Sequence, residues 1–173
     1  DYSDPGTITT TDATGVVDKV WFDHRDLVVR RQDGHGGAVT SRYDDNERLI
    51  NKTESNGRTA GANYLLDGRL TSIFDESGLT FFDSQNVMLA GGQTVELTSS
   101  IVDPRKNETS FVYNDHGNLI ETKFPDGTIE KATFDSDGNQ TSITNRRQQT
   151  VTQTFNANGQ ITQRVLPDGS SHT

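Results

Sequence analysis

The residues of this chain that could bind a metal ion are the acidic and amide side chains of one short segment. Asp135-Ser136-Asp137-Gly138-Asn139 resembles the start of a calcium-binding loop. A complete EF-hand loop needs glycine at its sixth position and glutamate at its twelfth. Those positions hold Gln140 and Arg146, so we predict a hairpin turn and no metal site. Weak calcium binding across stacked turns is the alternative that the sequence leaves open.

The other reactive side chains form no pattern that is typical of an enzyme. His24, His35, His116 and His172 have no ligand spacing, and we interpret them as solvated turn residues. The sequence has no G-x-S-x-G, P-loop or H-E-x-x-H motif. A glycosidase needs two carboxylates at a fixed separation, and nothing selects two of the 25 acidic residues. We therefore predict no catalytic residue, no cofactor and no enzymatic activity.

Trp21 is the single tryptophan and the one residue that we consider for ligand binding. It precedes Phe22, and in an alternating strand the two side chains point to opposite faces. If Phe22 packs against neighbouring repeats, Trp21 faces outward, where its ring could stack on a sugar. The alternative, which we favour, is that Trp21 covers the exposed first hairpin as a cap.

The elements that position these residues follow a repeat of about 21 residues, a period typical of repeat architectures. An aromatic residue marks each of seven units: Phe22, Tyr43, Tyr64, Phe82, Tyr113, Phe134 and Phe155. The next residue is Asp or Asn in six of the seven, and its side chain can cap its own turn. The residue six positions after the aromatic is apolar in six of the seven, as at Leu49, Leu70, Leu119 and Ile161. We predict that these aromatic and aliphatic side chains stack between repeats as a thin spine.

Each unit has the composition of two short strands separated by turns. Asn-Gly and Asp-Gly dipeptides predict two-residue hairpin turns, because such turns require positive φ. The turn glycines are Gly57, Gly68, Gly117, Gly127, Gly138, Gly159 and Gly169. Between the turns, Thr, Val, Ile, Phe and Tyr alternate with polar residues, as half-buried strands require. The predicted fold is all-β: tandem antiparallel β-hairpin repeats that form a long curved or coiled sheet, a partial β-shell.

The chain is predicted to be one repeat array over residues 1–173. The spacing changes only in the middle, with 18 residues from Tyr64 to Phe82 and 31 from Phe82 to Tyr113. We therefore predict a first run of repeats over residues 16–89, an irregular insertion over 90–104, and a second run over 105–173.

Composition restricts the partners and the setting. Hydrophobic residues make up only 29% of the chain, so a thick sandwich core is not expected. The net charge of −9 argues against nucleic acid and anionic membranes as partners. No apolar run is long enough to span a membrane, and the absence of cysteine excludes disulfides. Because the chain begins and ends within the repeat pattern, we expect it to be a segment of a longer protein.

The repeat units resemble YD repeats, the repeats of the rearrangement hotspot (RHS) family. Their pattern is an aromatic-Asp pair, two residues, Gly, a polar residue and Leu, with Pro-Asp-Gly further on. It is clearest from Tyr113-Asn114-Asp115-His116-Gly117-Asn118-Leu119 to Pro125-Asp126-Gly127, and again from Tyr43-Asp44 to Leu49. The stretch from Val102 to Thr109 resembles the family's Asp-Pro-x-Gly-Asn lead-in, with Lys106 in place of Gly. The resemblance covers most of the chain and is weakest between about Thr80 and Ser100.

This resemblance implies a large bacterial protein that is secreted or exposed at the cell surface. In bacterial members a spiral of β-hairpins closes into a hollow shell around a toxic C-terminal polypeptide; in the related teneurins the shell belongs to an adhesion receptor. It implies a non-enzymatic structural module whose partner is the remainder of its own polypeptide or shell. The alternative is a module that binds a glycan or a surface protein in recognition or adhesion. Open strand edges at both ends also predict self-association.

Overall fold

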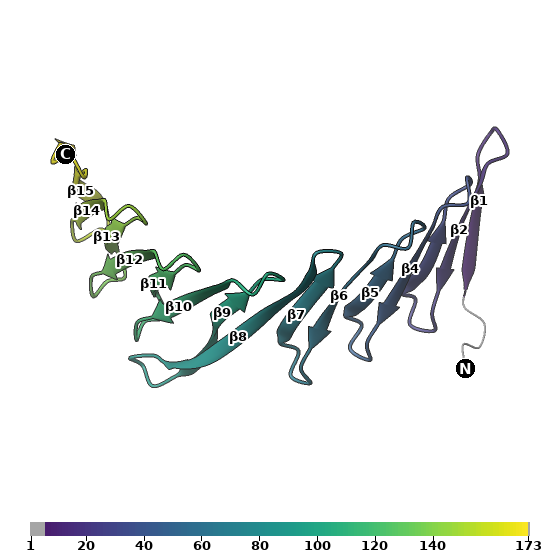
Figure 1. The fold of residues 1–173 in the computed structure, drawn as a ribbon, viewed down its shortest axis with the longest axis horizontal. Helices are drawn as coiled ribbons and strands as arrows, with labels where there is room; N and C mark the ends of the chain where they lie inside the picture. Colours follow the sequence, from purple (N-terminus) through teal and green to yellow (C-terminus); the bar gives the residue numbers. More distant parts are fainter. Residues whose placement is uncertain (1–5, 173) are drawn as a thin grey trace. The chain divides into compact units, whose positions relative to one another are not determined.

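The computed structural model describes residues 6–172, and every regular element in this range is a β-strand (Figure 1). The chain divides into two compact units, with the boundary between Thr80 and Phe81. No helix within the described range is long and apolar enough to cross a membrane. The prediction of an all-β fold built from tandem antiparallel hairpins is confirmed.

Unit 1 contains seven complete strands, each paired antiparallel with the next in the chain. They are β1 (Thr7–Thr11), β2 (Val17–Phe22), β3 (Val28–Gln32), β4 (Ala38–Tyr43), β5 (Leu49–Thr53), β6 (Thr59–Tyr64) and β7 (Leu70–Asp75). Strand β8 (Gly78–Met88) begins at the end of this unit and continues into the next.

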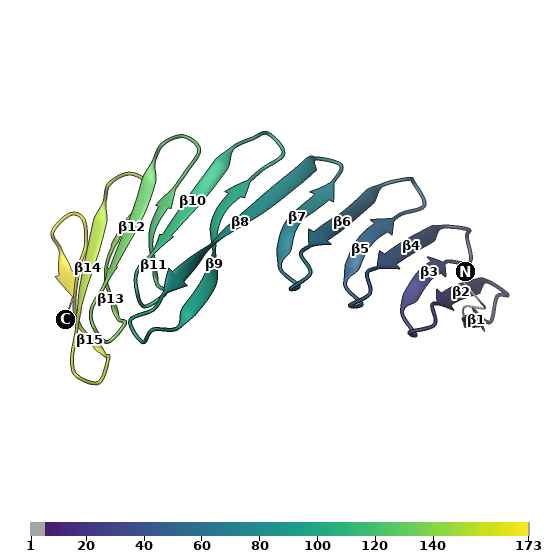
Figure 2. The same cartoon turned by 90° about the horizontal axis from the view of Figure 1, so that it is seen from below.

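Unit 2 repeats the same arrangement, and the strands of each unit lie side by side in chain order (Figure 2). After β8 come β9 (Thr94–Val102), β10 (Glu108–Tyr113), β11 (Leu119–Lys123), β12 (Ile129–Phe134), β13 (Gln140–Thr144), β14 (Thr150–Phe155), β15 (Ile161–Val165) and β16 (Ser171–His172).

Most hairpin turns have three loop residues instead of the predicted two. After β10, the Asn114 N–H donates to the Asn118 carbonyl and the Gly117 N–H donates to the Asn114 carbonyl, both at 3.0 Å. Gly117 has a φ of 79°, and this is the pattern of a type I turn closed by a G1 bulge. Counted from Asn114, Gly117 is the fourth residue of the turn. The seven predicted turn glycines all occupy this fourth position, with φ between 74° and 97°. The prediction of two-residue turns was wrong, because Asn-Gly and Asp-Gly fill the third and fourth residues of these turns. Only the fourth residue needs positive φ.

The strand register explains two of the repeating sequence columns. Six of the seven repeat aromatics lie directly opposite the residue six positions later, as Tyr43 does with Leu49 and Tyr113 with Leu119. The residue seven positions after the aromatic is skipped by the pairing and forms a β-bulge in six hairpins. The bulge residues are all β-branched: Val29, Ile50, Thr71, Ile120, Thr141 and Thr162. A bulge of this kind increases the local twist of its hairpin.

The segment over residues 90–104, predicted to be an irregular insertion, contains strand β9. It pairs with β8 from Phe81–Val102 to Met88–Thr94, and these strands have 11 and nine residues. The wider spacing of the repeat therefore reflects a longer hairpin, so this part of the prediction was wrong. Phe82 pairs with Ile101 in the middle of β8, and Met88 lies on the same strand. The outer boundaries of the two predicted runs stay predictions.

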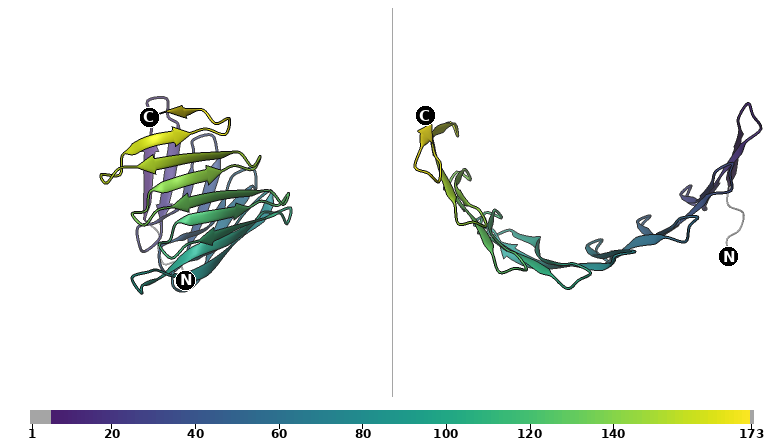
Figure 3. Two further views of the ribbon diagram at one scale, coloured as in Figure 1. Left: turned by 90° about the vertical axis from the view of Figure 1, so that its left-hand side faces the viewer. Right: turned by 45° about the horizontal axis from the view of Figure 1, so that its top comes forward.

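Each unit is a single layer of strands (Figure 3), and no hydrophobic side chain of the described range is fully buried. Within residues 6–172, the buried side chains are polar: Asp23, Ser72 and Ser100. The seven spine aromatics and Leu70 are half-buried, whereas Leu49, Leu119 and Ile161 are 38%, 40% and 54% exposed. The spine prediction was wrong for these three aliphatic residues, because within its unit each is flanked by its cross-strand partner and has no second layer above it.

Candidate functional site

Five of the six Asp and Asn residues that follow a repeat aromatic cap their own turns, as predicted; the sixth, Asp83, lies within β8 and accepts a hydrogen bond from the Ser100 hydroxyl instead. The Asp44 Oδ1 accepts hydrogen bonds from the backbone N–H groups of Asn46 and Arg48, both at 2.9 Å. The Asn114 Oδ1 accepts the equivalent bonds from His116 and Asn118 at 3.0 and 2.9 Å. These groups stabilise the loop by satisfying its backbone donors.

The calcium-like segment is one of these capped turns. The Asp135 Oδ1 accepts the N–H groups of Asp137 at 3.0 Å and Asn139 at 2.8 Å, and its Oδ2 accepts the Asn139 side-chain amide at 3.0 Å. Both carboxylate oxygens of Asp135 therefore already take part in the hydrogen bonds of their own turn. Within residues 6–172, no group of three or more His, Cys, Asp or Glu side chains could hold a metal ion.

The turn contacts also lower the pKa of Asp135 below its ordinary value. The side-chain amide of Asn139 has the largest effect, burial opposes it, and the backbone N–H groups of the turn add to it. For Asp44 the largest effect is burial, which raises the pKa, but hydrogen bonds from Arg48 and Asn46 outweigh it and the pKa is lowered. Both carboxylates are therefore stabilised in the ionised form, which makes them poor proton donors near neutral pH.

The four histidines are exposed and occur in different parts of the chain. His116 has an acidic partner, with its Nδ1 2.7 Å from the Asp115 Oδ1. His24, His35 and His116 lie in turns, while His172 belongs to β16. The structure gives them no shared arrangement that would suggest catalysis or metal binding.

Two arginines link consecutive turns of unit 1, a feature that sequence reasoning missed. The Arg48 Nε donates to the Asp44 Oδ2 at 2.7 Å, and its guanidinium lies over the Tyr64 ring, 4.6 Å from the centroid. Arg25 bonds to Asp23 in its own turn, and its Nη1 donates to the Asp44 carbonyl at 2.6 Å. Arg25 and Arg48 lie at different positions after their repeat aromatics, so no sequence column could have revealed the shared role.

Trp21 lies in β2, paired with Thr7 of β1 and Arg30 of β3. The Arg30 guanidinium carbon is 4.9 Å from the ring centroid, a cation–π contact, and the ring is half-buried. One more strand, β1, therefore lies between Trp21 and the edge of the unit. The role of Trp21 in glycan stacking and its alternative role as a cap both stay predictions.

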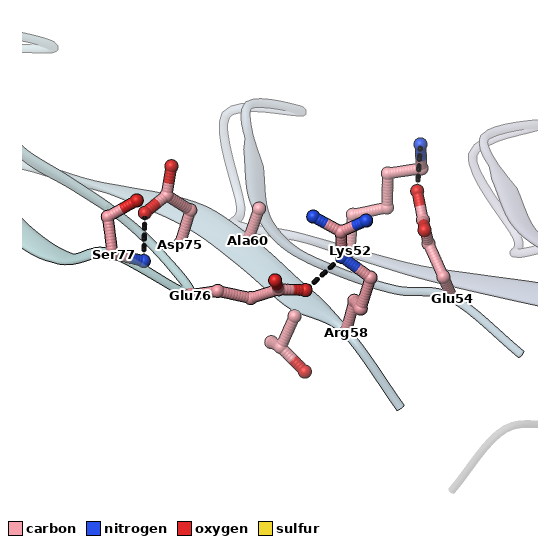
Figure 4. Close-up of a pocket in the computed structure, with 8 residues that line it drawn as sticks. Lys52, Glu54, Arg58, Ala60, Asp75, Glu76 and Ser77 are labelled. Carbon is pink, nitrogen blue, oxygen red and sulfur yellow. Dashed lines mark hydrogen bonds and ion pairs between the residues drawn. The ribbon is translucent and has the colours of Figure 1, made fainter. Parts of the chain in front are cut away.

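A charged surface hollow of about 290 Å³ lies between two turns of unit 1 (Figure 4). Lys52 pairs with Glu54 at 3.7 Å, and Arg58 pairs with Glu76. The Asp75 Oδ1 accepts the Ser77 N–H at 2.7 Å. The two cations of this hollow therefore already have acidic partners.

Comparison with known proteins gives one family match and several similar folds. The family model described as RHS Repeat matches residues 134–171. The crystal structure of TcdB2-TccC3 without the hypervariable C-terminal region superposes with a TM-score of 0.57, at 15% identity over 86% of this chain. The crystal structure of TcdB2-TccC3 gives a TM-score of 0.56 at the same identity and coverage. This chain spans 9% of the length of either solved chain, and no curated protein matches it.

Proposed function

Because residues 134–171 match the RHS Repeat model and the hairpins continue the same repeat over both units, we propose that this chain is a non-enzymatic structural module of a large exported bacterial protein. In this proposal its hairpins form part of a β-hairpin shell that shields or carries a cargo or toxin domain. Its main partner is then the rest of its own polypeptide, which would continue the strand pairing at both ends.

The observation that carries the proposal is that each unit is one hydrogen-bonded layer without a buried apolar core. Strand pairing connects each repeat to the next, and Arg25 and Arg48 add contacts between consecutive repeats of unit 1. A layer of this kind is suited to be a wall, since its stability depends on neighbouring repeats and leaves both faces available. Catalysis would instead need converging side chains in a protected cleft.

The similar folds support the same interpretation at the level of architecture. They belong to TcdB2-TccC3, one of them solved without its hypervariable C-terminal region. A variable region that can be removed while the fold persists fits a wall that is separate from its contents. Because this chain spans about a tenth of those chains, enclosure of a cargo is a property proposed for the complete protein.

Protease protection in the full-length parent protein tests this function. We expect the region enclosed by the repeats to survive a protease concentration that degrades the same region expressed alone. A parent protein whose wall is opened, for example by Gly61→Trp, should lose this protection while its secretion signal and cargo sequence are unchanged. Equal cleavage of the enclosed and the isolated region would contradict the shielding function.

A recognition module is the second candidate, because Trp21 lies on a face of β2 that no second layer of unit 1 covers and its ring keeps part of its surface exposed. A tryptophan on the polar face of a sheet can stack on a sugar or anchor a protein partner. A glycan array probed with this chain and with Trp21→Ala distinguishes the cases. Saturable binding that depends on Trp21 supports recognition. If a folded sample binds no glycan on the array, the result argues against glycan recognition.

A further inference from the structure

We propose that one face of unit 1 binds an extended acidic polypeptide segment through Lys19, Arg30 and Arg42. This inference is independent of the shell function, because it depends only on the charges that the register places on this face.

The register places the three cations on the same face of three adjacent strands. Arg30 of β3 is paired with Trp21 of β2, and Lys19 lies two residues before Trp21. On its other side Arg30 is paired with Thr40 of β4, and Arg42 lies two residues after Thr40. Cross-strand partners share a face, and so do residues two apart in one strand.

The three cations form a regular diagonal line. Strands β2 and β4 run in the same direction, because each is antiparallel to β3. Each step from Lys19 to Arg30 to Arg42 therefore crosses one strand, about 4.8 Å, and advances two residues, about 6.8 Å. The resulting spacing is about 8 Å between successive α-carbons.

The positive charge of this line has no acidic partner on the same face. All three side chains are exposed, and none forms an ion pair within the described part of the chain. The Arg30 guanidinium lies over the Trp21 ring and donates a hydrogen bond to the Gln32 Oε1 at 3.3 Å. The strand residues of β1 to β7 on this face include no Asp or Glu. In a chain of net charge −9, this is a local inversion of the charge.

An acidic polypeptide in extended conformation fits this line. Alternate side chains of a strand lie on one side about 6.7 Å apart, which flexible Lys and Arg side chains can match. The guanidinium groups of Arg30 and Arg42 can each bind a carboxylate with two parallel hydrogen bonds. Thr40 and Asn51, on the same face, add neutral hydrogen-bonding groups. Because Arg30 already covers part of the Trp21 ring, stacking of a sugar is less favoured than pairing with carboxylates.

Titration with defined peptides tests this site, with Trp21 as the single fluorescent reporter. The probe is a short peptide of alternating Glu and Ser, and its control is the same peptide with Gln in place of Glu. We expect a saturable fluorescence change and calorimetric binding with the Glu peptide only, weakened by added salt because the charges are exposed. Arg42→Gln and Lys19→Gln should each weaken binding about 1.5- to fivefold, the range for exposed ion pairs.

Arg31→Gln is the matched control variant. Arg31 is the neighbour of Arg30 in β3, is exposed and has no ion pair in the described residues, but it pairs with Val20 and Val39 on the opposite face. Arg31→Gln should leave binding unchanged. Equal weakening by Arg31→Gln would show a general charge effect and overturn the site. No binding of the Glu peptide to a folded sample, or tighter binding of polygalacturonate, would overturn it as well.

Discussion

The hydroxyl group of Tyr113 lies 2.9 Å from the backbone carbonyl oxygen of Thr98, 15 residues earlier in the chain. Tyr43 makes the same contact with Val28, also 15 residues earlier, at 3.2 Å. Each bond joins the aromatic of one repeat to a strand of the preceding repeat. The tyrosines therefore stabilise the array between repeats as well as within their own hairpins.

Removal of these hydroxyl groups should weaken the array. We expect Tyr43→Phe and Tyr113→Phe each to lower the free energy of unfolding by about 1 kcal/mol, the usual net value of one hydrogen bond. The matched control is Tyr64→Phe, because the Tyr64 hydroxyl has no hydrogen bond within residues 6–172. Urea denaturation of the three variants measures the difference, and an equal loss in all three would contradict the role of the hydroxyl bonds.

Gly61 should not tolerate a side chain. A Cβ atom at Gly61 would overlap the Ile50 carbonyl oxygen and the ring of Phe74, its cross-strand partner. We expect Gly61→Ala to destabilise the fold by about 1–3 kcal/mol, as overpacking does. Gly91→Ala is the control, since a Cβ there meets nothing within 4 Å. Thermal unfolding monitored by circular dichroism should separate the two variants, and equal melting temperatures would show that both the Ile50 carbonyl and the Phe74 ring shift without a cost in stability.

The turn of Gln148 is strained by its side chain. Gln148 has a φ of 61°, at the position that other turns fill with glycine. We expect Gln148→Gly to raise the free energy of unfolding by about 0.5–1 kcal/mol. Glycine removes the cost of about 1–2 kcal/mol that a side chain has in the left-handed conformation. Part of this gain is lost because glycine is more flexible in the unfolded chain.

Gln149→Gly serves as the opposite control for this turn. The Gln149 side chain accepts a hydrogen bond from Asn145 at 3.0 Å, so its removal should lower stability. If denaturant unfolding shows Gln148→Gly to be destabilising as well, backbone strain at this position is not the deciding factor.

Acid should destabilise the Asp-capped turns selectively. Folding lowers the pKa of Asp135 below its ordinary value of 3.8. Its ionised form therefore stabilises the fold fully above pH 3.8. This contribution is lost as the pH falls from 3.8 through the lower folded pKa. Asp135→Asn keeps a capping oxygen, as Asn114 and Asn156 do in their turns, but does not titrate.

We therefore expect Asp135→Asn to have nearly the wild-type stability at neutral pH and to lose less of it on acidification. Denaturant unfolding at a series of pH values down to and below 3.8 measures this. An identical loss in both proteins would show that the Asp135 cap does not contribute to acid sensitivity.

Sequence reasoning predicted the repeat and the fold because each hairpin carries its own local signals. The aromatic column, the apolar residue six positions later and the turn glycines are set by strand pairing and backbone conformation. The bulge was missed although its signal was present, since Val29, Ile50 and Thr71 form a β-branched column. The strand β9 was mistaken for an insertion because a longer hairpin shifts the period without changing the strand composition.

The contacts of the candidate site were less predictable than the fold. Arg48 reaches Asp44 in its own turn and Tyr64 in the next repeat, and such a bridge depends on side-chain reach. Trp21 could be singled out from its type alone. Its cation–π contact with Arg30 required the cross-strand register, which the predicted two-residue turns would have placed differently.

The most direct test of the central claim is an electron cryo-microscopy map of the full-length parent protein. The account predicts that these repeats form part of a continuous single-layer wall, that neighbouring repeats pair with β1 and β16, and that the wall encloses density for another part of the chain. A map in which this segment is an open ribbon, with both faces in solvent and no enclosed density, would contradict the shell function.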